Sequence, residues 1–258
     1  MKKIITIILI ALITMNIALG AEHSEILGRE WYERRAEGSP GPTAQAGPIS
    51  MAIKYYEIAL QNSPSEENTI WLLKCYYFKG SFVNMSREDK KTLFDKGKTI
   101  GEKMAAKYPH SAAIKYWLAA QYGKWAKAYG PIKAAREGLA DKVHKLAEDV
   151  VSIDPTYNEG GGYALLGLLH YHAPYIPFFL TWPDDEIALE NLKKAMLAAP
   201  SPANKLCYAR AIEDSGRHIE SINLLKETIQ MNARAEKLIE DRNSIAQAKE
   251  LLTELLKH

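Results

Sequence analysis

The sequence predicts an all-α protein, folded as a solenoid of about four to five helix pairs with inserts and a long C-terminal capping helix. Prolines recur at nearly equal spacing, and a similar pattern of small and apolar residues precedes each of them. Apolar residues recur with a helical period, and no alternating pattern typical of strands competes with it. The composition, 47% hydrophobic and 25% charged over 258 residues, is that of a globular protein. It excludes a disordered tail, a collagen and a polytopic membrane protein.

The N-terminus has the three parts of a secretory signal peptide. Two lysines precede an apolar run over 4–15, and small residues at Ala18 and Gly20 place a cut before Ala21. We therefore expect residues 1–20 to be a signal peptide and the mature protein to be periplasmic or secreted. An uncleaved N-terminal anchor is the alternative. After removal of the signal, no later run is apolar enough to span a membrane.

Residues 21–48 are expected to form an N-terminal helix and a linker. The helix covers 25–37. The linker, 38–48, contains three glycines and three prolines, which disfavour a helix. The helical-repeat domain then covers 49–258.

The repeats are marked by Pro64, Pro109, Pro155 and Pro200, which are 45, 46 and 45 residues apart. The residues 12, 8 and 5 positions before each proline are small or apolar, and these spacings fall on one face of a helix. Small residues there let a second helix approach closely, and the proline ends the first helix. The positions are Ala52, Tyr56 and Ala59; Gly97, Gly101 and Met104; Val143, Ala147 and Val150; Ala188, Leu192 and Ala195; and, in a fifth copy without proline, Ser221, Leu225 and Thr228.

A second helix is expected after each proline. Its apolar residues are Trp71, Leu73 and Tyr77; Trp117, Leu118, Ala119 and Tyr122; Leu166, Gly167 and Tyr171; and Leu206 and Ala209. The pattern resembles the tetratricopeptide repeat, in which Trp-x2-Leu-Gly-x2-Tyr in one helix precedes Ala-x3-Phe-x2-Ala-x4-Pro in the next. The resemblance implies helix pairs stacked into a superhelix with a concave face. Because that unit has only about 34 residues, inserts are expected over 79–91, 123–140 and 172–185.

The chain ends in one long predicted helix over 234–256. Apolar residues spaced for one face are Leu238, Ile245, Ala248, Leu252 and Leu255. A terminal helix with a polar outer face covers the last core surface of a solenoid, so we expect this helix to act as a cap.

The mature chain is expected to be neutral, which argues against a nucleic-acid partner. Lys and Arg total 33 and Asp and Glu total 31, and the excess lies in Lys2 and Lys3 of the signal peptide. Cys75 and Cys207 each lie in an apolar helical pattern, so free buried thiols are expected. A disulfide is the alternative, because exported compartments permit one.

No motif predicts catalysis, a cofactor or a metal. The Gly-Lys-Thr at 97–99 lacks the earlier glycine of a phosphate-binding loop, and the glycine run over 158–162 follows no strand. His170 and His172 are two residues apart, so on a helix they point in different directions and do not form a metal pair. The acidic run at 184–186 is expected to cap a helix. We therefore predict a protein that is not an enzyme; an enzyme with scattered residues and no motif is the alternative.

The expected site is a concave groove rich in aromatic side chains. Neighbouring residues on a helix are about 100° apart, so adjacent aromatic residues cannot all enter the core. The uncharged, apolar insert over 172–183 either packs on the helices or covers one end of the groove. An uncharged aromatic lining would favour binding, whereas charges beside a histidine would favour an enzyme. The predicted ligand- or partner-binding residues are Tyr76, Tyr77, Tyr116, Trp117, Trp125, Tyr175, Phe178, Phe179 and Trp182.

Short segments spread over residues 45–255 give a narrower resemblance. They are Ala128-Tyr129-Gly130-Pro131, Asp154-Pro155 with Tyr157, Gly160-Gly161-Gly162-Tyr163, Leu166-Gly167, Ala173-Pro174, Pro177, Lys193-Lys194-Ala195 and Ala198-Ala199-Pro200. Together they are similar to the T-component family associated with TRAP transporters. The resemblance implies an exported helical-repeat protein that works beside a periplasmic solute-binding protein. No cysteine directly follows the predicted signal peptide, so this chain departs from the members that are lipoproteins.

The sequence as a whole predicts an exported, non-catalytic scaffold. It would bind a partner protein, or a small apolar ligand, in the aromatic groove. The resemblance to the T-component family implies that it acts as an accessory to a TRAP-type transporter. The implied partner is a solute-binding protein. The alternative is an envelope protein that works by self-assembly, as a homo-oligomer.

Overall fold

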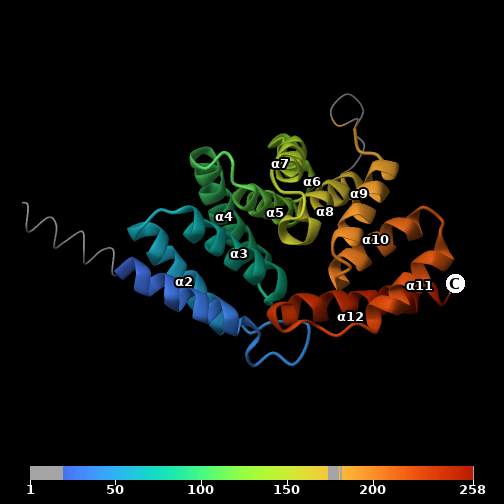
Figure 1. Ribbon diagram of the computed structural model, residues 1–258, viewed down its shortest axis with the longest axis horizontal. Helices are drawn as coiled ribbons and strands as arrows, with labels where there is room; N and C mark the ends of the chain where they lie inside the picture. The colour runs from blue at the N-terminus through green and yellow to red at the C-terminus, as the bar shows by residue number, and fades with distance from the viewer. Residues whose placement is uncertain (1–19, 174–179, 181, 258) are drawn as a thin grey trace, which may run out of the picture.

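The chain forms an α-solenoid, seen here in a computed structural model that describes residues 20–173, 180 and 182–257 (Figure 1). A helix over 20–33 comes first, followed by the 3-10 turn η1 (Arg34–Ala36). The helices that follow are α2 (Ala46–Asn62), α3 (Glu66–Phe82), α4 (Arg87–Lys107), α5 (Ala112–Tyr129), α6 (Pro131–Arg136), α7 (Leu139–Ile153), α8 (Tyr157–His172), α9 (Asp185–Ala198), α10 (Pro202–Asp214) and α11 (His218–Ile229). The 3-10 turn η2 (Ala235–Lys237) leads into α12 (Leu238–Leu255).

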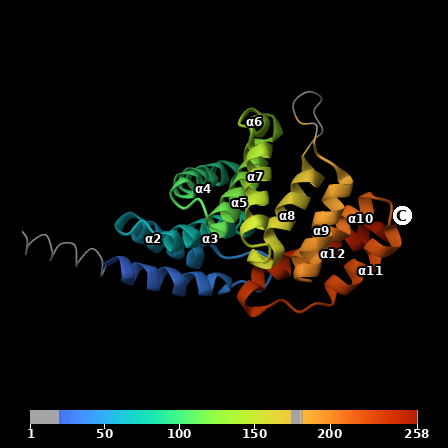
Figure 2. The same ribbon diagram turned by 45° about the horizontal axis from the view of Figure 1, so that its top comes forward.

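The helices stack in pairs to form an arch (Figures 1 and 2). In the described ranges the pairs are helix 20–33 with α2, then α3 with α4, α5 with α7, α8 with α9, and α10 with α11. The first helices α3, α5, α8 and α10 also contact one another in succession and line the concave side. The predicted all-α solenoid is therefore confirmed.

The predicted repeat register is confirmed as well. All fifteen positions named for the four proline-linked copies and the fifth copy are buried. The glycines lie where helices approach most closely: a Cβ on Gly101 of α4 would lie 2.8 Å from Leu118 of α5. Gly167 of α8 lies just as close to α9, where a Cβ would lie 2.6 Å from Leu192. Helix pairs therefore meet at small residues, as the spacing predicts.

The residues predicted as inserts mostly lengthen helices. The first insert is taken up by the end of α3 and the start of α4, where the Ser86 hydroxyl caps the helix by accepting the Asp89 N–H at 3.1 Å. The second forms the end of α5, the short α6 and the start of α7, with a turn at Gly130 (φ 97°). In the third, residues 174–179 and 181 lie outside the described residues.

Helix α2 begins inside the predicted linker. It starts at Ala46 and includes Pro48 in its first turn, where a proline is tolerated because that N–H needs no helical partner. The rest of 38–48 is not helical, and the Ala44 N–H donates to the Phe82 carbonyl at 2.8 Å. This bond ties the segment to the end of α3.

Helix α12 does more than cap the last pair, which was its predicted role. Its second half lies in the last core cluster, where Ala248 and Leu252 pack with residues of α10 and α11. Its first turn reaches the opposite end of the arch: Ile239 is fully buried in the N-terminal core with Tyr32 and Phe78. Helix α12 therefore lies across the opening of the arch and links its two ends (Figure 1).

The predicted signal peptide lies almost entirely outside the described residues. Only Gly20 of this segment is described, within helix 20–33. The cut before Ala21 stays a prediction. In the described ranges, no helix combines the length and the apolar character that crossing a bilayer requires.

Candidate functional site

Three successive first helices bring four aromatic side chains together on the concave side. The ring centroids of Tyr77 (α3) and Trp117 (α5) are 5.4 Å apart, edge to face. Trp117 lies 5.0 Å from Tyr116, which lies 5.5 Å from Tyr157 of α8. The Trp117 indole N–H donates to the Tyr157 hydroxyl oxygen at 3.0 Å. The three tyrosines are only half-buried, so this aromatic strip keeps accessible edges.

The aromatic strip ends at an unusual backbone turn. Asn158, Glu159 and Gly160, at the start of α8, have φ values of 47°, 67° and 72°. A non-glycine residue loses about 1–2 kcal/mol in this left-handed conformation, so surrounding contacts must hold the turn. Two contacts do so: Gly160 packs on α9, where a Cβ would lie 2.9 Å from Ala198, and the Glu159 carbonyl accepts a side-chain N–H of Asn204 at 3.0 Å.

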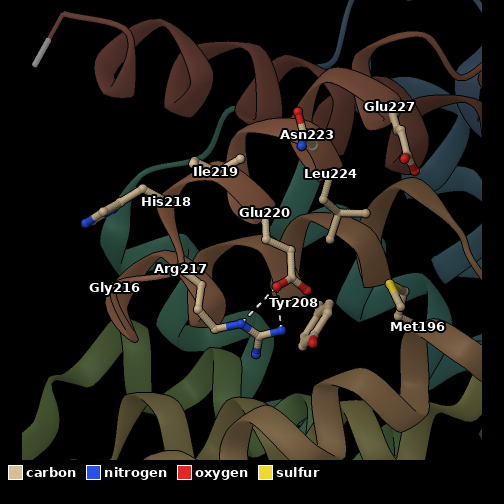
Figure 3. A pocket seen from close by; sticks show the side chains of 10 residues that line it. All are labelled: Met196, Tyr208, Gly216, Arg217, His218, Ile219, Glu220, Asn223, Leu224 and Glu227. Carbon is tan, nitrogen blue, oxygen red and sulfur yellow. Dashed lines mark hydrogen bonds and ion pairs between the residues drawn. The ribbon is translucent and has the colours of Figure 1, made fainter.

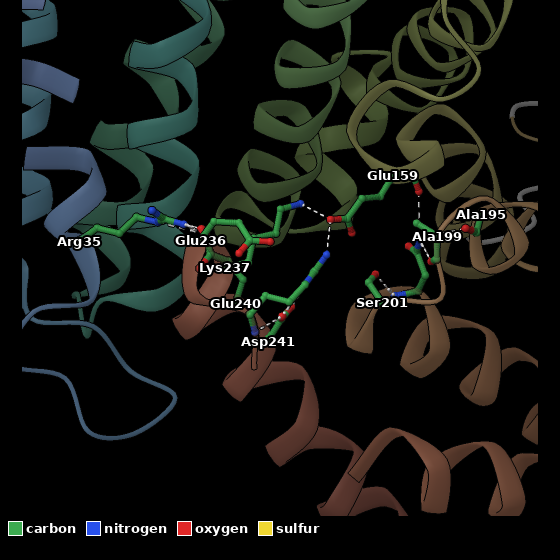
Figure 4. A network of polar contacts seen from close by, with 11 residues as sticks. Arg35, Glu159, Ala195, Ala199, Ser201, Glu236, Lys237, Glu240 and Asp241 are labelled. Atoms are coloured by element: carbon green, nitrogen blue, oxygen red, sulfur yellow. Dashed lines mark hydrogen bonds and ion pairs between the residues drawn. The ribbon is translucent and has the colours of Figure 1, made fainter. Parts of the chain in front are cut away.

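A network of charges holds the elbow that leads into α12, residues 234–241 with the first turn of that helix, against α8 (Figure 4). Asp241 is 1% exposed and accepts hydrogen bonds from Arg234 Nε at 2.7 Å and Nη2 at 2.8 Å. Arg234 Nη1 and Lys237 Nζ both reach Glu159 Oε1, at 2.6 and 2.8 Å. Burial raises the pKa of Glu159, but the hydrogen bonds from Lys237 and Arg234 outweigh it. The net pKa is lower than usual, and the carboxylate is charged.

The same elbow is tied to the N-terminal helices by Arg35, which points toward Glu236 (Figure 4). The Arg35 guanidinium is buried over the Tyr32 ring, donates to the Glu236 carbonyl, and donates to Glu240 Oε1 at 3.0 Å. Arg35 and Glu240 are 205 residues apart. Sequence reasoning missed this bridge because residues so far apart share no spacing that could reveal the contact.

Beside the aromatic strip, α3, α5 and α8 enclose a shallow hollow of about 390 Å³. Lys74 Nζ lies 3.8 Å from the centroid of the Trp71 ring. Burial, together with the positive charges of Arg35, Lys237 and Arg29, lowers the pKa of Lys74 to about 8. We call this feature the Lys74 hollow; its lining consists of Glu66, Glu67, Ile70, Trp71, Lys74, Ala113 and Tyr157.

A basic region lies near the C-terminal ends of α5 and α8, away from the Lys74 hollow. Burial, and then the positive charges of Arg210 (α10) and Lys127 (α5), lower the pKa of His172 at the end of α8. Lys124, one turn before Lys127, lies with Nζ 4.9 Å from the Tyr77 ring centroid. The concave face is therefore aromatic, as predicted, but it is not uncharged.

The cysteines do not supply a nucleophile to this basic region. Burial raises the pKa of Cys207 on α10 in spite of the nearby Arg210 and Lys124, so the group is a protonated thiol at neutral pH. Cys75 is fully buried on α3, and burial raises its pKa in the same way. Both cysteines are free. Positive charges therefore lie beside His172, but neither cysteine supplies the thiolate that cysteine catalysis requires.

Two of the predicted groove residues lie elsewhere. Tyr76 is 1% exposed and its hydroxyl donates to Glu57 of α2 at 2.7 Å, on the side of α3 away from Tyr77. Trp125 is 2% exposed and its indole N–H donates to Asp95 of α4 at 2.6 Å. Each side chain packs against the second helix of the preceding pair, so the expectation that they line the groove does not hold. Adjacent aromatic residues do divide between core and groove, as helix geometry predicts.

The apolar insert can be followed only in part. Tyr175, Phe178 and Phe179 lie outside the described residues. Trp182 is half-buried between two histidines, with ring centroids 4.7 Å from His144 and 5.0 Å from His170. Its indole N–H donates to Asp141 of α7 at 3.0 Å. This end of the insert packs on α7 and α8.

Acid is expected to weaken the packing around Trp182. The buried His170 accepts the Asp184 N–H at Nδ1, 3.1 Å away, so it must be unprotonated there. Burial, and then the charge of His144, lower the pKa of His170, while Asp184 opposes them. The unfolded chain therefore binds this proton more readily than the folded chain. The contribution of the neutral His170 to the free energy of unfolding is fully present above pH about 6.5, and it is lost as the pH falls toward the pKa of His170 in the folded chain.

The variant His170→Asn isolates this effect, because its Oδ1 can accept the same N–H and does not titrate. On acidification from pH about 7.5 to about 5.5, we expect urea unfolding to show a larger loss for the original chain than for the variant. A His170 ring that titrates by NMR at or above its usual pKa of about 6.5 would contradict the prediction.

A larger hollow lies on the outer side, between α9, α10 and α11 (Figure 3). It measures about 640 Å³, has Tyr208, Met196 and Leu224 in its wall, and carries the Arg217–Glu220 ion pair beside it. No sequence pattern singled out this surface. It lies apart from the aromatic strip.

The motifs rejected from the sequence have structural roles. Lys98 lies in α4 and pairs with Glu137 at 2.8 Å. Asp184 caps α9 by accepting the N–H groups of Glu186 and Ile187. Within the described residues, no group of three His, Cys, Asp or Glu side chains is placed to hold a metal ion.

Comparison with known proteins supports the fold alone. No protein-family description and no curated protein matches the sequence. Among solved structures, the chain is similar to a thermophilic TPR protein in Thermus thermophilus, with a TM-score of 0.61 and 15% sequence identity. The match covers 92% of this chain and 100% of that protein. The fold is therefore that of a tetratricopeptide-like solenoid; the narrower resemblance to the T-component family is not confirmed.

Proposed function

We propose that this chain is an exported, non-catalytic scaffold that binds a partner protein on its concave face. The tetratricopeptide-like fold supports a protein-interaction role in general. The observation that carries the specific proposal is the aromatic strip. Half-buried tyrosines beside a tryptophan, contributed by three successive helices, offer the rigid amphipathic surface that protein partners favour.

The proposed cellular role follows from the sequence. The signal-peptide pattern supports export to the periplasm or beyond. The resemblance to the T-component family supports a periplasmic solute-binding protein as the partner and an accessory role in TRAP-type transport.

A photo-crosslinking amino acid at Tyr77 tests the binding face in the cell of origin. The control position is Leu197, 68% exposed on the outer helix α9. We expect one protein to cross-link reproducibly from Tyr77 and not from Leu197, and mass spectrometry to identify it as a solute-binding protein. Equal adducts at both positions, or none, would contradict the proposed face. An N-terminal peptide of the same sample should begin at Ala21.

A further inference from the structure

Within the part of the chain that the structure describes, Lys74 has no carboxylate partner, whereas the cations around it each have one. Its positive neighbours are paired: Arg29 with Glu67 at 2.6 Å, Lys237 with Glu159 at 2.8 Å, and Arg35 with Glu240 at 3.0 Å. Among the described residues, the Lys74 ammonium forms no ion pair. It lies half-buried on the face of Trp71, where burial and its neighbours disfavour the charge.

The open hollow beside this ammonium is large enough for a small molecule. The Lys74 hollow measures about 390 Å³, near the lower end of the range for ligand sites of about 300–1,000 Å³. Ile70, Trp71, Ala113 and Tyr157 supply apolar and aromatic walls from three helices. Tyr157 is fixed there by the left-handed turn that follows it and by its hydrogen bond from Trp117.

The charges around the hollow limit the ligand further. An anion would give Lys74 the partner that it lacks and would relieve the repulsion from the nearby cations. The exposed Glu66 and Glu67 also line the hollow, and their negative charges disfavour a multiply charged anion such as phosphate. A single negative charge on a flat or branched apolar body fits both conditions.

We infer that the Lys74 hollow binds a small organic monocarboxylate, with its carboxylate on the Lys74 ammonium and its apolar body against Trp71, Ala113 and Tyr157. This inference rests on the proposed function only in placing ligands on the concave face. It adds a ligand class and a site that are independent of the partner protein. Cross-linking to a partner and binding of a carboxylate can therefore succeed or fail separately.

The test uses the mature chain labelled with 13C at the lysine ε carbons, so that NMR reports the protonation of Lys74. The probes are benzoate, phenylacetate and indole-3-acetate, each compared with its neutral amide, and inorganic phosphate. At least one carboxylate should bind and raise the pKa of Lys74 by about one unit or more, because a bound anion favours the charged amine. The amides and phosphate should bind at least about tenfold more weakly, a difference equal to about one pKa unit.

Three variants complete the test. Lys74→Met removes the charge and should weaken carboxylate binding by about tenfold or more, whereas Lys74→Arg should retain most of it. Lys79→Met, on the same helix but outside the hollow, should bind as the original chain does. The inference is overturned if no carboxylate binds, if amides or phosphate bind as tightly, or if Lys74→Met binds unchanged. Carboxylate binding without partner cross-linking at Tyr77 would remove the proposed function and leave this site.

Discussion

Replacing Arg234 by methionine is expected to lower the free energy of unfolding by about 3–5 kcal/mol, because it leaves a buried carboxylate without its partner. Asp241 is 2% exposed at its side chain and accepts three hydrogen bonds from Arg234, two of them from the guanidinium. Methionine preserves much of the length of the side chain but not the charge. In this variant, Glu159 would keep its ion pair with Lys237 but lose the one with Arg234. Chemical denaturation at neutral pH measures the effect.

Two controls separate this effect from the general loss of an ion pair. Arg34→Met breaks an exposed pair with Glu37, whose side chains are 51% and 55% exposed, and should lower the stability far less than Arg234→Met does, because solvent screens an exposed pair. Adding Asp241→Asn to Arg234→Met should restore part of the stability, since it removes the unpaired charge. A loss below about 1 kcal/mol for Arg234→Met would show that the elbow does not hold α12.

The repeat was predictable from the sequence because its cause is local. Two helices can cross closely only where side chains are small, and that requirement returns with each helix pair. Ala52, Ala147 and Ala195 therefore lie 12, 8 and 5 residues before their prolines, at the three positions of the repeated pattern, and each is buried. The proline itself ends or follows a helix for a reason that needs no tertiary contact.

The role of α12 was not predictable in this way. Its apolar residues indicate one buried face, but not which core that face enters, and Ile239 enters the core at the opposite end of the arch. The charged contacts of the elbow join Arg234 to Glu159, 75 residues away, and Arg35 to Glu240. Such pairs depend on the curvature of the whole solenoid, which no local pattern specifies.

The sequence predicted the aromatic character of the candidate site better than it predicted the individual residues that form it. The sequence indicated that adjacent aromatic residues must divide between core and groove, and Tyr77, Tyr116 and Trp117 do meet on the concave face. It did not indicate which member of a pair faces which way, so Tyr76 was assigned to the wrong side. Lys74 drew no attention because a lysine on a helix is usually solvated. Only its burial beside paired cations makes it unusual.

The position of α12 also restricts what the concave face can accept. The elbow occupies the space between the N-terminal helices and α8, so a partner cannot fill the whole arch as long as α12 is docked. The accessible parts are the aromatic strip, the Lys74 hollow and the basic region near Lys127 and Arg210. The network around Arg234 therefore shapes the face on which partner and ligand are proposed to bind.

Replacing Gly160 by alanine is expected to lower the free energy of unfolding by about 2–5 kcal/mol, from two separate causes. The residue has φ 72°, and alanine in this left-handed conformation loses about 1–2 kcal/mol. A Cβ would also lie 2.9 Å from Ala198 and 3.3 Å from the backbone of Ala195, and overpacking of a close contact costs about 1–3 kcal/mol.

Gly138→Ala separates the two causes. Gly138 has φ 61°, but a Cβ at this position would meet no neighbouring atom within 4 Å. Alanine there should therefore show the backbone cost alone, about 1–2 kcal/mol. The excess at Gly160 in urea unfolding then measures the packing of α8 on α9. Equal losses at the two glycines would mean that α9 does not hold the left-handed turn, and that the position of Tyr157 in the Lys74 hollow has another cause.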